Sequence, residues 1–358
     1  WREENGKQYF YEDGVKKTDT WITWGNLKYY FGTDGALRTE TWLHQGDNWY
    51  YVDYYGAAMT GRREVDGVDY FFDSDSVMQA NRWIEQDGGS FYVQSSGAVA
   101  TNTWLHLGDK WFYVDAKGIR AVGLVKVGTG WYHFSDDGVM STGWQQIGGS
   151  WYYLGDSGAM ATGWQQIGGT WYLFSKYGSM ATGWQQIGGN WYYLGGSGAM
   201  ATGWQQIGGN WYYLGNSGAM ATDWQQIGGN WYYLGDSGAM ATGWKLIHWH
   251  WYYFQSNGAM AQNQWVDNYY LDRNGAMMIN RTVTINGRSY TFDGNGRWST
   301  PATDGSCPGW APIKGNVNRQ GEKIFHQPGD QSYKVTKPEQ CFTTPDDAKS
   351  AGFRAAKR

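Results

Sequence analysis

Aromatic and small residues follow one another along this chain in a pattern that repeats every twenty positions. The copy that begins at Thr222 reads TDWQQIGGNWYYLGDSGAMA, and nearly the same letters begin at Thr162, Thr182 and Thr202. In each copy, two short runs of aromatic and β-branched residues flank a glycine pair, and glycine readily adopts the positive φ that tight hairpin turns need. The pattern therefore predicts one β-hairpin per copy, with the GDSGAMAT segment as the loop to the next hairpin.

Two tryptophans, seven residues apart, mark the register of each copy. The first of them recurs at Trp144, Trp164, Trp184, Trp204, Trp224 and Trp244. In weaker copies one or both are replaced, as in Trp21 with Lys28, Leu124 with Trp131, Arg62 with Asp69 and Trp83 with Ser90. We count about fifteen copies, which we divide into a divergent region at residues 1–141 and a regular region at residues 142–298.

The composition fits a fold whose apolar contacts are made by rings. The chain has 358 residues, of which 25 are Trp, 28 are Tyr and 13 are Phe, whereas Leu, Ile and Val are scarce. A single two-stranded hairpin is marginally stable in water, so each hairpin must stack on its neighbours. We therefore predict a mainly β fold, an elongated β-hairpin solenoid of about fifteen repeats, followed by a small α+β C-terminal domain.

Other features of the sequence exclude some function classes. No apolar run approaches the ~20 residues of a membrane span, so we expect a soluble chain. Because Trp1 lies inside a repeat-like segment, we expect a mature fragment whose targeting segment is absent. The formal net charge of −4 disfavours general nucleic-acid binding. Recurring carboxylate pairs, a glycine-rich phosphate loop and a Ser–His–Asp pattern are all missing, so we expect no enzyme activity.

The paired tryptophans suggest a binding site. Strand alternation places Trp151 and Tyr153 on one face of a hairpin and Tyr152 on the other face. We expect residues like Tyr153 and Ile147 to form the core. Two indoles that face each other across a turn, with a Tyr and a Met from the neighbouring hairpin, would form a box of π faces. Such a box suits a quaternary ammonium group, which needs no carboxylate or hydrogen bond for its attraction to rings.

The repeat resembles the choline-binding repeat of the Gram-positive choline-binding proteins. The resemblance covers roughly residues 1–298 and is strongest over residues 142–262. It implies that choline lies between consecutive copies, held by two Trp from one hairpin and a Tyr from the next, with a Met closing the box. Position by position, it implies boxes at Trp144, Trp151, Tyr172 and Met180; at Trp164, Trp171, Tyr192 and Met200; at Trp184, Trp191, Tyr212 and Met220; at Trp204, Trp211, Tyr232 and Met240; at Trp224, Trp231, Tyr252 and Met260; and at Trp244, Trp251 and Tyr269.

The choice of the first Tyr of each pair as the third wall rests on the face argument alone. Two divergent copies also keep both indoles, Trp42 with Trp49 and Trp104 with Trp111, and are further candidates, although the copies after them depart from the pattern. Where Lys28, Asp69 or Ser90 replaces the second Trp, the box lacks a wall, and we expect a structural junction.

The composition changes after Arg297. We expect a linker at residues 299–306 and a small domain at residues 307–358, which holds five of the six Pro, both Cys and a basic end. This segment resembles the small sunset domain of secreted bacterial surface proteins, which implies a small β-sheet with a C-terminal helix. The basic residues are Lys314, Arg319, Lys323, Lys334 and Lys337, together with the end of the chain; they permit an anionic partner, and a solvated surface is the simpler interpretation.

The two cysteines permit several arrangements. Cys307 and Cys341 suit a disulfide in an exported domain of this size. A zinc site would need both thiolates, His326 and a fourth ligand that the sequence does not indicate. Catalysis by Cys341 with His326 also stays open, as does a pair of free thiols. We expect His248 and His250 to lie on one strand face at the surface of a hairpin, without a metal.

The resemblance to the choline-binding proteins implies a non-enzymatic cell-surface protein that binds phosphocholine of teichoic and lipoteichoic acids, and we expect it to display a C-terminal module with an adhesion or effector role toward a host protein. No cofactor is predicted apart from zinc in that module. Two further functions stay open: the binding module of a cell-wall hydrolase whose catalytic domain lies elsewhere, and a glucan-binding repeat protein. Glucan sites need polar side chains around the rings, whereas Gly, Ala and Met flank these rings.

Overall fold

The computed structural model describes residues 1–86, 88–302 and 305–357. The chain divides into two compact units, Trp1–Ala181 and Thr182–Arg358, which we describe separately. Almost all regular structure is β: within the described residues there are fifteen two-stranded sheets and one seven-stranded sheet. This confirms the predicted mainly β fold of hairpin repeats.

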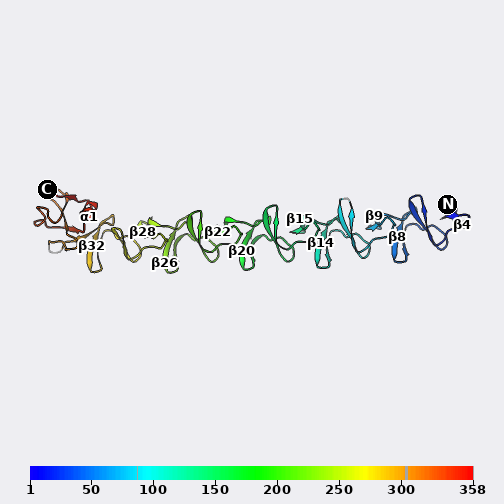
Figure 1. Ribbon diagram of the computed structural model, residues 1–358, viewed down its shortest axis with the longest axis horizontal. Helices are drawn as coiled ribbons and strands as arrows, with labels where there is room; N and C mark the ends of the chain where they lie inside the picture. The colour runs from blue at the N-terminus through cyan, green and yellow to red at the C-terminus, as the bar shows by residue number, and fades with distance from the viewer. Residues whose placement is uncertain (87, 303–304, 358) are drawn as a thin grey trace. The chain divides into compact units, whose positions relative to one another are not determined.

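The N-terminal unit is a succession of antiparallel hairpins (Figure 1). Its strands are β1 (Arg2–Glu4), β2 (Lys7–Tyr9), β3 (Tyr11–Glu12), β4 (Val15–Lys16), β5 (Thr20–Trp24), β6 (Leu27–Phe31), β7 (Thr41–Gln45), β8 (Asn48–Val52), β9 (Gly61–Val65), β10 (Val68–Phe72), β11 (Arg82–Gln86), β12 (Gly89–Val93), β13 (Thr103–Leu107), β14 (Lys110–Val114), β15 (Gly123–Val127), β16 (Gly130–Phe134), β17 (Gly143–Ile147), β18 (Ser150–Leu154), β19 (Gly163–Ile167) and β20 (Thr170–Phe174).

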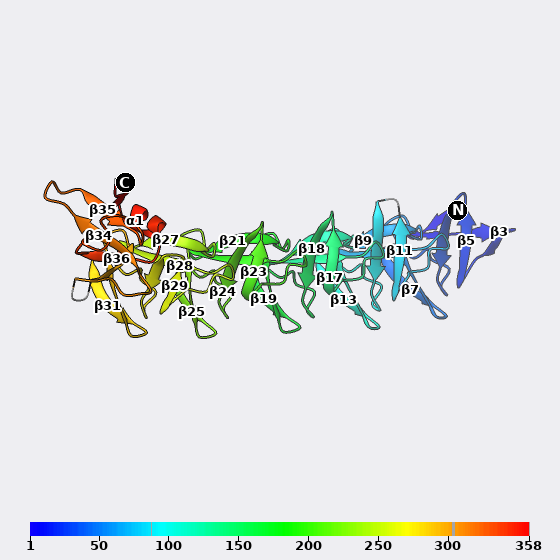
Figure 2. The same cartoon turned by 60° about the vertical axis from the view of Figure 1, so that its left-hand side comes forward.

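The C-terminal unit continues with hairpins and ends in the seven-stranded sheet and one helix (Figure 2). Its elements are β21 (Gly183–Ile187), β22 (Asn190–Leu194), β23 (Gly203–Ile207), β24 (Asn210–Leu214), β25 (Asp223–Ile227), β26 (Asn230–Leu234), β27 (Gly243–Ile247), β28 (His250–Phe254), β29 (Gln264–Val266), β30 (Tyr269–Leu271), β31 (Arg281–Ile285), β32 (Arg288–Phe292), β33 (Trp298–Pro301), β34 (Ile313–Val317), β35 (Lys323–His326), β36 (Gln340–Phe342), α1 (Pro345–Ser350) and β37 (Arg354–Ala355). In the described part of the chain, no helix has the length and apolar character to span a membrane.

Each hairpin has the register that the sequence predicts. In β17–β18, Trp144 lies opposite Tyr153 and Gln146 lies opposite Trp151. The two turn residues, Gly148 and Gly149, have φ of 57° and 82°. Positive φ at both central residues is the requirement of a tight two-residue hairpin turn.

The histidine pair in the hairpin β27–β28 differs from the prediction. His248 lies in the turn with φ of 46°, whereas His250 begins β28. The two residues therefore do not share a strand face, because the turn occupies the positions that the glycine pair fills in other copies.

Within each unit, backbone hydrogen bonds join a hairpin to the one before it. After β18, the N–H of Met160 donates to the carbonyl of Trp131 in β16 (2.9 Å), and the N–H of Ala161 donates to the carbonyl of Tyr153 (2.8 Å). The segment that follows a hairpin thus bonds both its own second strand and the second strand of the preceding hairpin. This pattern provides the stacking that a marginally stable hairpin requires.

The core lies at the end of the second strand of each hairpin. Leu154 and Phe174 in the N-terminal unit, and Leu214 and Leu234 in the C-terminal unit, are almost fully buried. The prediction that residues like Ile147 form the core is confirmed at Ile247, which is buried, and is wrong at Ile187, which is 39% exposed; Ile147 itself is half-buried. Residues like Tyr153 are half-buried and contact the first Trp of their own hairpin.

Replacing Gly238 by alanine is expected to destabilise its junction by about 1–3 kcal/mol. Gly238 has φ of 79°, and a Cβ there would lie 2.3 Å from Sδ of Met220, in the preceding copy. Gly235, in the same loop, lacks positive φ, and its Cβ would lie 3.8 Å from the nearest atom. We expect faster amide hydrogen exchange in β23–β26 for Gly238→Ala and little change for Gly235→Ala. Equal exchange in the two variants would contradict this explanation.

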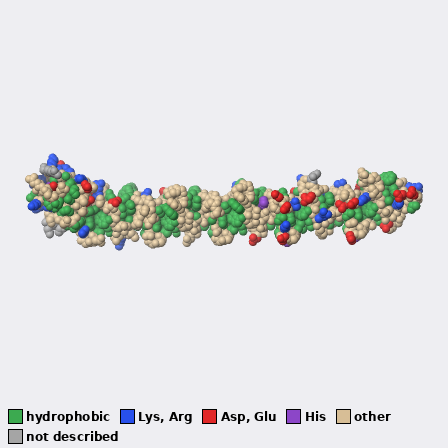
Figure 3. Space-filling model, in the orientation of Figure 1, with side chains coloured by type: hydrophobic (Ala, Val, Ile, Leu, Met, Phe, Trp, Pro, Cys, Tyr) green, Lys and Arg blue, Asp and Glu red, His purple; other side chains and the backbone are tan. Residues whose placement is uncertain are grey.

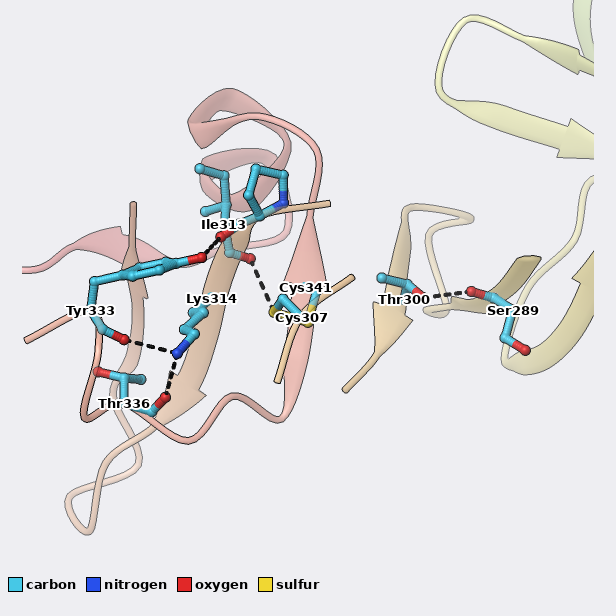
Figure 4. Close-up of a disulfide and its surroundings, with 9 residues drawn as sticks. Ser289, Thr300, Cys307, Ile313, Lys314, Tyr333, Thr336 and Cys341 are labelled. Carbon is cyan, nitrogen blue, oxygen red and sulfur yellow. Dashed lines mark hydrogen bonds between the residues drawn. A yellow bond between two sulfur atoms is a disulfide. The ribbon is translucent and has the colours of Figure 1, made fainter. Parts of the chain in front are cut away.

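The seven-stranded sheet joins the last repeat hairpin to the C-terminal module, which we define as residues 307–357. Strand β33 pairs with β32 of the last hairpin and with β36 of the module. The prediction of a linker at residues 299–306 is therefore wrong at its start, because residues 299–301 belong to β33. Ser299 and Thr300 are buried, and the Thr300 hydroxyl donates to the Ser289 carbonyl (2.7 Å) (Figure 4). These long-range pairings override the linker-like local composition.

The C-terminal module has the small sheet and helix that we predicted. Its core contains Ile313, Phe325, Phe342, Ala348 and Phe353. The Thr344 side chain accepts from the Asp347 N–H at the start of α1, which caps the helix. The module is therefore a folded extension of the repeat array in the C-terminal unit.

A disulfide joins Cys307 to Cys341 (Figure 4). Because each sulfur is bonded to the other, neither offers the thiolate that a zinc site or a catalytic cysteine requires, and the free-thiol hypothesis is likewise wrong. Lys314, which we expected at a basic surface, is buried. Its Nζ donates to the carbonyls of Tyr333 (2.9 Å) and Thr336 (3.1 Å), so this lysine ties a loop to the sheet.

The stability of the module is expected to fall below pH ~6.5, the ordinary pKa of an imidazole. His326 is buried, and burial lowers its pKa; Asp330 opposes this shift and Lys314 adds to it. The unfolded chain therefore binds a proton more readily than the folded module, and stability is lost as pH falls from that value toward the lowered pKa. Urea unfolding of the module at pH 7.5 and 5 would measure the effect. His326→Gln should remove most of the difference; an unchanged difference would contradict the assignment.

Candidate aromatic binding boxes

Two cavities in the C-terminal unit are formed by the predicted sets of residues. Trp224 and Trp231 of β25–β26, with Tyr252 and Met260 of the next copy, line a cavity of about 450 Å³. Trp244, Trp251 and Tyr269 line a second cavity of about 250 Å³, together with Met277. Met277 was not among the predicted residues. We call each set of two Trp, one Tyr and one Met a box and name it by its first Trp.

The rings of each box come from two consecutive hairpins. In the Trp224 box, the first Trp lies edge to face with Trp231 of its own hairpin and with Tyr252 of the next, with ring centroids 6.4 and 4.8 Å apart. The N–H of Met260 donates to the carbonyl of Trp231 (2.7 Å), which fixes the Met beside the second Trp. Three rings and a thioether therefore surround a space with no charged wall among the four.

The same arrangement recurs in the other boxes of each unit. The ring centroid of Trp144 lies 4.9 Å from that of Tyr172 and 6.3 Å from that of Trp151. The ring centroid of Trp184 lies 5.0 Å from that of Tyr212 and 6.4 Å from that of Trp191. The ring centroids of Trp204 and Tyr232 are 4.9 Å apart. The N–H groups of Met180, Met220 and Met240 donate to the carbonyls of Trp151, Trp191 and Trp211 (2.7, 2.7 and 2.8 Å). The structure thus brings the first Tyr of each pair to the first Trp, as the face argument predicts.

One predicted box divides between the two units. Trp164 and Trp171 lie in the N-terminal unit with ring centroids 6.5 Å apart, whereas Tyr192 and Met200 belong to the C-terminal unit. For this box we describe only the indole pair, whose separation is close to that in the other boxes.

The second Trp of each box is unusually exposed for an indole. Trp151, Trp211, Trp231 and Trp251 are 43, 41, 39 and 42% exposed, and Trp49 and Trp111 are both 42% exposed. A ring that served only to fill the core would be covered. Repetition of the same open ring at each box instead indicates a surface kept free for a ligand.

The N-terminal boxes are more complete than their sequence suggested. The ring centroid of Trp42 lies 6.4 Å from that of Trp49 and 4.8 Å from that of Tyr70. The N–H of Met78 donates to the Trp49 carbonyl (2.8 Å). The sequence-based prediction missed Tyr70 and Met78. They lie 28 and 36 residues after the first Trp, the same offsets as in the regular copies, and this was the signal that could have revealed them.

The box of Trp104 follows the same rule. Its ring lies 6.4 Å from Trp111 and 4.9 Å from Tyr132, and the N–H of Met140 donates to the Trp111 carbonyl (2.8 Å). Tyr132 and Met140 were also missed. The structure therefore gives both divergent boxes a third ring and a Met.

Where the second Trp is replaced, charged side chains of the protein approach the rings. The Arg120 guanidinium lies 5.2 Å from the Trp83 ring, at the junction where Ser90 replaces Trp. At the next junction toward the N-terminus, Arg62 forms an ion pair with Asp69 (2.7 Å) and lies 5.1 Å from the Phe91 ring. Lys28 pairs with Asp75 (3.4 Å). These contacts fit the expectation that such junctions are structural.

The electrostatic surroundings of the regular boxes suit a cation. Figure 3 shows Asp, Glu, Lys and Arg gathered toward the N-terminus of the N-terminal unit and few of them over the regular copies of the C-terminal unit. A quaternary ammonium group in a regular box would meet π faces without competition from a protein cation, except at the Trp224 box, whose lining includes Arg273.

Family models match most of the repeat region. Two models described as choline-binding repeat match residues 121–162, 161–202, 201–242 and 221–265, and residues 77–119 and 259–298. A model described as putative cell wall binding repeat matches residues 19–37, and a model described as ArfC matches residues 293–355. No curated protein matched the sequence.

Solved structures from Streptococcus pneumoniae are similar to the chain. CbpJ is 30% identical, with 72% of this chain and 99% of CbpJ covered and a TM-score of 0.51. The choline-binding domain of CbpL is 37% identical over 51% of this chain and 100% of that domain, with a TM-score of 0.41. The modular autolysin LytC, solved with a synthetic peptidoglycan ligand, is 27% identical over 67% of this chain and 52% of LytC, with a TM-score of 0.46. From the matching repeats and the nearly complete coverage of CbpJ, the chain belongs to the choline-binding protein family.

Proposed function

We propose that the chain is a non-enzymatic anchor that holds to phosphocholine of teichoic and lipoteichoic acids through its boxes, at the surface of a Gram-positive bacterium. The observation that carries the proposal is the pair of cavities lined by two Trp, one Tyr and one Met. The C-terminal module, joined to the last hairpin by shared strands, is the part that such an anchor would display, in an adhesion or effector role toward a host protein.

The strength of the anchor would come from the number of its boxes. One desolvated cation–π contact provides about 2 kcal/mol, and a box with millimolar affinity corresponds to about −4 kcal/mol. Several such boxes on one chain, facing a polymer with many cholines, would raise the effective affinity by ~10²–10⁴. A weak individual site is therefore sufficient for firm attachment.

Titration of choline chloride against intrinsic Trp fluorescence tests the proposal, with tetramethylammonium and dextran as parallel ligands. We expect a saturable change with both ammonium compounds, because the rings recognise the cation and not the hydroxyl group, and no change with dextran. A response to dextran alone would favour the glucan-binding hypothesis, and no response to choline would contradict the proposal.

A further inference from the structure

The Trp224 box differs from its neighbour in one charged residue at its opening. Besides the four box residues, Gln262, Arg273 and Asn274 line its cavity. The Trp244 box has Asn295 at its cavity instead. Both asparagines lie in the loop two hairpins after the first Trp, as the third residue of DRNG and of DGNG. The residue before each of them is Arg273 in one loop and Gly294 in the other.

Arg273 is available to a ligand. Its side chain is exposed, and within the described residues it forms no ion pair with a carboxylate. The adjacent Asp272 accepts from the backbone N–H groups of Asn274 (2.8 Å) and Ala276 (2.9 Å), so that carboxylate holds the loop in shape. Arg273 therefore lines this box without being held in an ion pair by the neighbouring carboxylate.

A free cation at this opening would repel a bare quaternary ammonium. A phosphocholine ester, in contrast, carries a phosphate a few bonds from its ammonium group. Guanidinium groups bind phosphate oxygens through paired N–H donors, and they do so more specifically than an ammonium does. The rings can thus hold the cationic end of such a ligand while the arginine holds its anionic end.

We propose that Arg273 makes the Trp224 box selective for phosphocholine esters over free choline; this inference rests on the proposed function. The corresponding loop residue is Asp236, Ser256 or Gly294 in the neighbouring copies of the C-terminal unit. The preference therefore belongs to the Trp224 box and not to the array as a whole.

The methionines allow each box to be followed separately. We would label the methyl groups of Met with ¹³C in the full chain and assign Met260 and Met277 by single substitutions to Leu. The Met260 resonance reports on the Trp224 box, and the Met277 resonance on the Trp244 box. Each would be titrated with choline, glycerophosphocholine and inorganic phosphate at low ionic strength, where an exposed ion pair is least screened.

We expect the ratio of glycerophosphocholine affinity to choline affinity to be about threefold to fivefold higher at Met260 than at Met277. This factor is the gain in affinity that one exposed ion pair provides. Arg273→Gln should bring the two ratios together, and Gly294→Arg should raise the ratio at Met277. Choline-substituted teichoic acid and phosphatidylcholine vesicles would then distinguish the source of the ester, and a Met260 response to either that Arg273→Gln weakens supports the proposal.

Two results would overturn it, and they differ from each other. Equal ratios at the two boxes, or a ratio that Arg273→Gln leaves unchanged, would reject the role of Arg273 while choline binding stands. If neither resonance moved with choline, the proposed function itself would fail.

Discussion

Free choline at tens of millimolar is expected to release the chain from choline-bearing cell walls. Under the proposed function each box has roughly millimolar affinity for choline, so free choline at tens of millimolar would occupy most boxes. Loss of simultaneous contacts removes a gain of about 10²–10⁴ in effective affinity. The bound fraction would be measured by sedimentation of purified walls. Sodium chloride at the same ionic strength is the control, because it screens charges without entering the rings, and retention of the protein in choline would contradict the multivalent model.

A matched pair of tryptophans tests whether the boxes are responsible. Trp231 is a wall of the Trp224 box, whereas Trp249 lies in a turn, is 90% exposed and lines neither of the two described cavities. Trp231→Ala should abolish the choline response of the Met260 resonance and weaken attachment to walls. Trp249→Ala should leave both unchanged. Equal losses in the two variants would indicate that exposed indoles act nonspecifically.

Removal of the disulfide is expected to unfold the C-terminal module while the repeats stay folded. Cys307 and Cys341 are 34 residues apart in sequence, and a loop of that length corresponds to about 3–4 kcal/mol in the chain-entropy model. The module has a core of only a few side chains, which gives it little stability to lose. The variant with both cysteines changed to Ser should show rapid amide exchange across the strands β34–β36.

Choline binding serves as the internal control for that experiment. The boxes contain no cysteine and lie in hairpins with their own stacking contacts, so their choline affinity should be the same in the variant. A module that stays protected without the disulfide would show that its apolar core is sufficient. Loss of choline binding would instead show that the module supports the repeats.

The hairpins and most of each box could be predicted because they depend on local rules. The glycine pair fixes the turn, and the alternation of side chains along a strand selects Tyr172 as the wall that the next hairpin brings to Trp144. The same rules failed where a copy is irregular. Tyr70 and Met78 lie in a copy whose first Trp is replaced by Arg62. Because that copy has no indole pair, its Tyr and Met were not assigned to a box.

Other features depend on contacts that no local pattern contains. Strand β33 forms because two distant strands, β32 and β36, pair with it. The position of the core at residues like Leu154 depends on which end of each hairpin lies inside the stack. Met277 lies three residues earlier than a regular copy would place it, because its copy has shorter strands.

The contact between each Met and the glycine of the following copy has a consequence for how the gene can change. Met220 meets Gly238, and Met200 and Met240 meet Gly218 and Gly258 in the same way, so these junctions in the regular part of the C-terminal unit use the same partners. Unequal recombination that removed residues 202–221 would join Ala201 to Thr222 and restore a junction of identical form. Copy number, and with it the number of boxes, can therefore rise or fall in single inherited steps, because each new junction uses contacts that the existing junctions already use.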